Sequence, residues 1–128
     1  MSARGWLYWS LVVIGAMTMV TGVVQAIAPG FILERLSAEA TAASLYFFAI
    51  VGMFMVLFGG LLLHALFSTA PQHVALLWAG LQKFGASAAV ALGVMNGVFS
   101  RLALLVALFD FVSGVLVISY WLSVKSPR

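Results

Sequence analysis

Four apolar runs, each long enough to cross a lipid bilayer, dominate this sequence. They cover about residues 6–28, 41–67, 74–98 and 101–122, and short segments containing proline, glycine, serine and charged residues separate them. A transmembrane helix needs about 20 consecutive, mostly apolar residues. Only 7% of the 128 residues are charged, too few to cover a water-soluble surface of this size. The sequence therefore predicts an all-α integral membrane four-helix bundle, up-down-up-down with short loops, as a single domain over residues 1–128.

Helix-breaking and capping residues lie between the apolar runs. Pro29 and Gly30 end the first run, as a helix-breaking pair should. Ser37 is a suitable N-cap for the second helix. Ser100 and Arg101 mark the turn before the fourth run. We therefore expect short connections and no separate soluble domain.

Tryptophan and basic residues predict how the helices are oriented. Tryptophan is enriched at the membrane–water interface, and an even number of crossings lets all four tryptophans fall on one side. These interfacial anchors are Trp6, Trp9, Trp78 and Trp121. The side that holds both termini has three basic residues and the other side has two, namely Arg4, Lys125 and Arg128 against Arg35 and Arg101. By the positive-inside rule we expect both termini in the cytoplasm, in a bacterial inner membrane.

Small residues recur at helical spacing on one face of each predicted helix. They are Gly15 and Gly22 in the first helix, Gly52 and Gly59 in the second, Gly85, Ala89, Gly93 and Gly97 in the third, and Ala103, Ala107 and Gly114 in the fourth. Gly93 and Gly97 form a GxxxG motif. Small residues let helix backbones approach closely in lipid. The stripes fit packing of the four helices within one chain, and they also fit a homo-oligomer or a partner interface.

Two ionisable residues, Lys83 and Asp110, lie deep within the apolar runs. Each costs about 2.5–3.5 kcal/mol at a helix centre, so neither should face lipid. Lys83 lies about 12–13 Å into the third helix at 1.5 Å per residue, and Asp110 enters the fourth from the opposite side. Their depths then differ by about 5 Å along the membrane normal. Because a short turn joins these helices, we expect an intramembrane ion pair.

The pair has several possible roles. One interpretation is a structural pair that fixes the register of two helices, and another is a functional polar site such as a proton relay or an anchor for a ligand headgroup. Two further alternatives are that Lys83 extends to the interface alone and that either residue pairs with another subunit. Side chains that could supply hydrogen bonds nearby are Gln82, Ser87, Asn96, Ser113, Gln25 and Thr18.

Several kinds of chemistry are not expected from this sequence. The absence of cysteine excludes disulfides and thiolate ligands. His64 and His73 lie near the connection between the second and third helices, whereas haem needs ligands that face each other across a bundle. The net charge of +3 is too small to indicate nucleic-acid binding. With one intramembrane acid and no hydrolase or phosphate-binding motif, we expect no enzyme activity, metal or cofactor.

Four segments resemble the small four-helix bacterial membrane proteins of the DoxX-like family. They are Pro29-Gly30, Phe58-Gly59-Gly60-Leu61, Leu81-Gln82-Lys83-Phe84-Gly85 and Leu108-Phe109-Asp110-Phe111. The similarity extends over most of the chain and consists mostly of hydropathy. It implies an accessory subunit of a membrane redox complex, or a protein of unassigned role.

Two functions follow as hypotheses from these features. The first is an accessory or structural subunit of a larger membrane complex, packed through its small-residue faces against partner subunits or further copies of itself. The alternative is a small transporter, or a bundle that binds a lipid-like or quinone-like ligand, built around Lys83 and Asp110. In both cases the expected surroundings are membrane lipids.

Overall fold

Four long apolar helices and one short helix make up the part of the chain that the computed structural model describes, residues 5–70 and 72–125. The long helices are α1 (Trp6–Ile27), α3 (Ala42–Phe67), α4 (His73–Met95) and α5 (Ala103–Lys125), and the short helix α2 (Pro29–Arg35) connects α1 to α3. A helix of 22 residues is about 33 Å long, enough to cross a hydrocarbon layer of about 30 Å. The chain is therefore all-α, with four candidate membrane spans.

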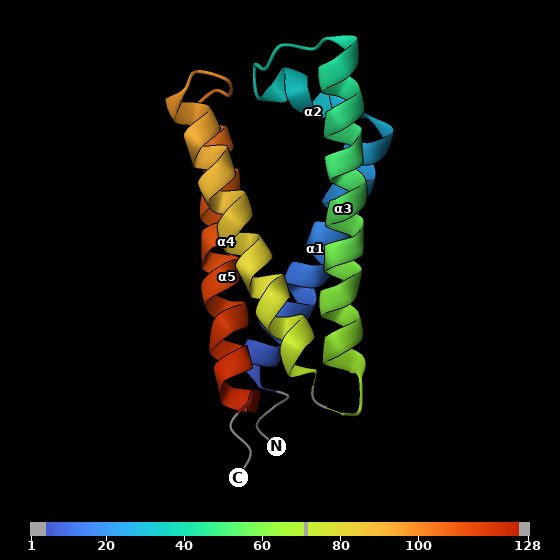
Figure 1. Cartoon of the computed structure of the whole chain (residues 1–128), viewed down its shortest axis with the longest axis vertical. Coiled ribbons are helices and arrows are strands. Elements are labelled where there is room, and N and C mark those ends of the chain that lie inside the picture. The colour runs from blue at the N-terminus through green and yellow to red at the C-terminus, as the bar shows by residue number, and fades with distance from the viewer. Residues whose placement is uncertain (1–4, 71, 126–128) are drawn as a thin grey trace.

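The long helices form two antiparallel pairs. α1 packs along α3, and α4 packs along α5 (Figure 1). The start of α1, the end of α5 and the α3–α4 connection lie at one end, which we call the terminal end. α2 and the α4–α5 turn lie at the opposite, distal end. Figure 1 shows the two pairs close together at the terminal end and separating toward the distal end.

The apolar core lies in the terminal half, where all four long helices meet. Its buried members are Tyr8, Leu11, Ile14, Leu62, Ala65, Leu66, Leu76, Ala79, Val117 and Tyr120. The phenol of Tyr8 donates a hydrogen bond of 2.9 Å to the carbonyl of Leu66, so this buried polar atom has a partner. Many large apolar side chains outside the core are exposed, as is expected of helices whose outer faces contact lipid.

Glycine-to-glycine contacts hold α1 against α3. A Cβ atom added to Gly22 would lie 2.7 Å from the carbonyl oxygen of Gly52, and one added to Gly59 would lie 2.8 Å from that of Gly15. Separations this short leave no room for a side chain between the backbones. The small residues of these two helices therefore pack within the chain, in the manner of membrane helices that approach closely.

The α4–α5 pair instead packs large side chains over small ones. Gly80 of α4 lies under Ile118, and Gly114 of α5 lies under the ring of Phe84. Ala103 and Ala107 of α5 are buried as well.

The connection between α1 and α3 differs from the sequence prediction in two ways. Pro29 does not only end a helix: it is the first residue of α2, where its missing N–H group is no loss. Ser37 is not the N-cap of α3, since it adopts a positive φ of 55°. Thr41 is the cap: its hydroxyl accepts from the Ser44 amide, and the Ser44 hydroxyl accepts from the Thr41 amide.

The small-residue stripe of the third helix was also predicted wrongly in part. α4 ends at Met95 rather than at residue 98, and Gly97 lies in the following turn with a φ of +76°. Gly93 lies against Phe99 of that same turn. The GxxxG motif therefore forms a helix end, not a helix–helix interface. Gly85 and Ala89 are exposed, and a Cβ atom on Gly85 would meet nothing within 4 Å.

Most helix bounds differ slightly from those predicted. α1 and α4 end earlier than expected, and α5 extends from Ala103 to Lys125 instead of residues 101–122. Residues 100–102 belong to the turn, in which the amide of Ala103 donates to the carbonyl of Ser100. Arg4 and Arg128, which carry two of the three charges behind the expected orientation, lie outside the described residues.

Candidate polar site between the helix pairs

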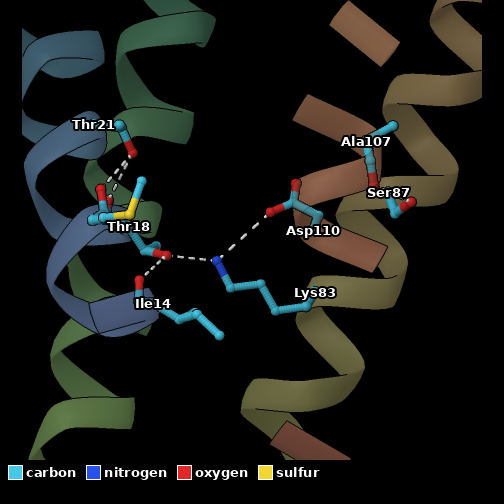
Figure 2. Close-up of polar contacts among 8 residues, drawn as sticks. Ile14, Thr18, Thr21, Lys83, Ser87, Ala107 and Asp110 are labelled. Atoms are coloured by element: carbon cyan, nitrogen blue, oxygen red, sulfur yellow. Dashed lines mark hydrogen bonds and ion pairs between the residues drawn. The ribbon is translucent and has the colours of Figure 1, made fainter. Parts of the chain in front are cut away.

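A cluster of three polar side chains joins the two helix pairs where they begin to separate. Lys83 comes from α4, Asp110 from α5 and Thr18 from α1 (Figure 2). The Lys83 Nζ atom lies 2.6 Å from the Thr18 Oγ1 atom and 3.6 Å from the Asp110 Oδ1 atom. Thr18 is one helical turn beyond Ile14, a member of the apolar core. The cluster therefore lies at the distal edge of that core.

The hydroxyl of Thr18 has a defined orientation. It donates its hydrogen to the carbonyl of Ile14 over 2.8 Å, so its lone pairs are free to accept from the ammonium group of Lys83. A lysine ammonium is only a donor, and a threonine hydroxyl that already donates elsewhere is a suitable partner. Figure 2 shows the lysine side chain extending from α4 across to α1.

All three side chains are shielded from the surroundings. The exposed fractions are 3% for Thr18, 5% for Lys83 and 9% for Asp110. The ring of Phe109 lies beside the ammonium, with its centroid 5.5 Å from Nζ, a distance at which an aromatic face attracts a cation. The charges are thus kept away from acyl chains, where isolated charges are costly.

The ion pair between Lys83 and Asp110 is not a close one. Its 3.6 Å separation exceeds the 2.7–2.9 Å that is typical of charge-assisted hydrogen bonds. Among the described residues, Lys83 is the only polar partner of the Asp110 carboxylate. The carboxylate is therefore held mainly by charge, and it has unused capacity to accept hydrogen bonds.

The other polar residues considered from the sequence do not join this cluster. Gln25 donates to the carbonyl of Phe48 at 3.0 Å and so links α1 to α3. Ser87 donates to the carbonyl of Ala107 at 2.8 Å and links α4 to α5. Ser113 is buried on α5, Gln82 is half-buried beside Lys83 on α4, and Asn96 is exposed at the end of α4.

A cavity of about 670 Å³ lies at the distal end. Residues of α3, of the α2–α3 connection and of the α4–α5 turn line it, including Glu39, Phe47, Phe48, Val51 and Phe99. The two connections also touch, because the amide of Ser100 donates 2.8 Å to the carbonyl of Leu36. Sequence reasoning missed this cavity, since it depends on how two irregular connections meet in space.

The histidines and tryptophans lie toward the terminal end of the helices. His64 is in the last turn of α3 and His73 begins α4. In the described part of the chain, no group of three His, Cys, Asp or Glu residues is arranged to hold a metal ion. The four predicted anchors lie near the start of α1, near the start of α4 and near the end of α5. Trp6, Trp9 and Trp78 are exposed, and Trp121 is half-buried.

Four apolar helices of membrane length and a charged cluster enclosed between them define a multi-pass membrane protein. No family model, no curated protein and no solved structure matches the chain. The resemblance to DoxX-like proteins thus gains no support from these comparisons.

Proposed function

We propose that this protein is a small binding or transport bundle that holds an amphipathic, membrane-soluble molecule between its two helix pairs. The Lys83–Asp110–Thr18 cluster is the observation that carries the proposal. A charged side chain inside a membrane protein is costly and therefore rare. Where one occurs it has a partner and usually marks a ligand or ion pathway. Here the partners come from both helix pairs.

The arrangement of the helices supports movement between the pairs. Each pair is tightly packed internally, through Gly22 and Gly52 in one pair and through Phe84 and Gly114 in the other. Between the pairs, the apolar core occupies only the terminal half. On the distal side of that core, the contact of Lys83 with Thr18 and the hydrogen bond from the Ser100 amide to the Leu36 carbonyl link the two halves of the molecule. A ligand group that binds the Asp110 carboxylate or the Lys83 ammonium would therefore change how the pairs are joined.

A binding experiment separates this role from a purely structural one. Wild-type protein and the Lys83→Met variant would be purified in mild detergent, and the small molecules that each retains would be identified by mass spectrometry. Loss of a retained molecule in Lys83→Met, with the helical content unchanged, is the expected result. Lys125→Met, which removes an exposed lysine at the end of α5, is the control. If the variants retain the same molecules and differ only in thermal stability, the pair is structural.

An accessory subunit is the second candidate function. The exposed small-residue face of α4 at Gly85 and Ala89 favours it, because such faces suit close contact with another membrane helix. The resemblance to DoxX-like proteins points the same way. Native mass spectrometry after gentle extraction should then show a particle much heavier than the 13.6 kDa chain. A monomer under those conditions would count strongly against it.

In either role we propose that the protein is not an enzyme. Asp110 is the one acidic residue within the four spans, so acid–base catalysis by two intramembrane carboxylates is not possible.

A further inference from the structure

The distal cavity is open to the surroundings, and its volume and mostly apolar lining are compatible with a small amphipathic molecule. Its volume of about 670 Å³ lies within the range of about 300–1,000 Å³ that is typical of ligand pockets. Its walls are aromatic and aliphatic, with Phe47, Phe48 and Val51 on α3 facing Val98 and Phe99 of the α4–α5 turn. Such walls favour the apolar body of a ligand.

The rim of the cavity carries one negative charge without a counter-ion. Glu39 lines the cavity, and its carboxylate forms no ion pair among the described residues. Arg35 pairs instead with Glu34 at 3.9 Å and lies over the ring of Phe31. Arg101, which is exposed in the α4–α5 turn, forms no ion pair with Glu39 either.

Glu39 is the one charged residue among the described residues that line the cavity, and the Ser44 hydroxyl beside it is already engaged. The hydroxyl of Ser44 donates 2.9 Å to the backbone carbonyl of Glu39 and accepts from the amide of Thr41. The Glu39 carboxylate is therefore the charged group that remains available to a ligand. Phenylalanine rings beside it add attraction for a cation, because an aromatic face is negatively polarised.

We propose that this cavity binds an amphipathic organic cation, with the positive charge at Glu39 and the apolar body among Phe47, Phe48 and Phe99. The proposal rests on the function proposed above and names the ligand class of the bundle.

Two probe ions of similar shape and opposite charge test the charge preference. Tetraphenylphosphonium and tetraphenylborate would be titrated into full-length protein in uncharged detergent, with binding followed by calorimetry. Saturable binding of one tetraphenylphosphonium per chain and no binding of tetraphenylborate is the expected result. Equal binding of both ions, or binding of neither, would overturn the proposal.

Matched variants locate the charge and the apolar contacts. Glu39→Gln should weaken tetraphenylphosphonium binding about fivefold, the upper end for a partly exposed ion pair. Glu34→Gln removes the same charge from the same end of the molecule, outside the cavity lining, and should leave binding unchanged. Phe47→Leu should weaken binding more than Phe54→Leu, since both are exposed on α3 but only Phe47 lines the cavity. Equal effects within either pair would contradict the assigned site.

A further variant distinguishes failure of this site from failure of the proposed function. Binding that is lost in the Lys83→Met/Asp110→Asn double variant but unchanged in Glu39→Gln would place the cation at the central cluster and overturn the cavity assignment. Binding that depends on Glu39 and ignores the double variant would support the cavity and count against a role for the cluster.

Discussion

Replacing Asp110 by asparagine should destabilise the fold more than removing both charged groups of the Lys83–Asp110 pair. Asparagine has nearly the same shape as aspartate, so the change creates no cavity. It leaves the Lys83 ammonium, 5% exposed, without a counter-ion. Removing one member of a buried ion pair is costly because the remaining charge stays buried, whereas replacing both members by neutral groups is often nearly neutral.

The size of the effect follows from the contacts of Lys83. A stranded buried charge costs about 3–5 kcal/mol in soluble proteins. Two contacts reduce that cost here: Thr18 still accepts from Nζ at 2.6 Å, and the side-chain oxygen of asparagine can accept as well. We therefore expect Asp110→Asn to lower the free energy of unfolding by about 2–4 kcal/mol. The Lys83→Met/Asp110→Asn double variant should stay within about 1 kcal/mol of wild type.

Reversible unfolding in mixed micelles, with increasing mole fraction of dodecyl sulfate, measures these differences. Helical content by circular dichroism and tryptophan fluorescence give two independent signals for the same transition. The Lys83→Met variant completes the double-mutant cycle, and a coupling energy of at least ~1.5 kcal/mol is expected. If Asp110→Asn and the double variant unfold at the same dodecyl sulfate fraction, the two groups do not interact directly.

Substitutions at four further positions test the helix packing, the polar cluster and the α4–α5 turn by the same unfolding measurement. Gly22→Ala should destabilise the fold by about 1–3 kcal/mol, because the added methyl group would lie 2.7 Å from the Gly52 carbonyl oxygen. Gly85→Ala should be neutral or slightly stabilising, because its methyl group would meet nothing within 4 Å. Thr18→Val should destabilise by about 1–3 kcal/mol through loss of the acceptor for the lysine, and Thr18→Ser should restore most of that loss. Gly97→Ala should cost about 1–2 kcal/mol because the residue has a φ of +76°; an unchanged midpoint would contradict the assigned turn.

The membrane spans were predictable because they depend on local composition. Long apolar runs between polar connections were enough to predict all-α architecture with four spans, as observed. The ends were less predictable. α4 ends at Met95, three residues earlier than predicted, because Gly97 adopts a left-handed conformation and the chain turns there. The spacing of a glycine in the sequence does not distinguish a position inside the helix from one in the following turn.

The polar cluster could be predicted in part from the sequence, whereas the cavity could not. Depth along two adjoining helices predicts that Lys83 and Asp110 are near each other, because both helices have known rise and direction. The hydroxyl of Thr18 was one of six candidates, and nothing local singled it out: its role depends on how α1 is rotated against α3 by the glycine contacts. The cavity arises from two connections whose shapes have no periodic signal.

The contact between Lys83 and Thr18 has a consequence for how the chain is made. Ribosomes add about 5–20 residues per second, so Lys83 is synthesised about 1–5 s before Asp110, which follows it by 27 residues. During that interval the lysine has no carboxylate to pair with, but α1 has already been synthesised. Thr18 is thus synthesised before Asp110, and we expect its hydroxyl to accept from the ammonium of Lys83 during the interval when an unpaired charge would otherwise oppose insertion.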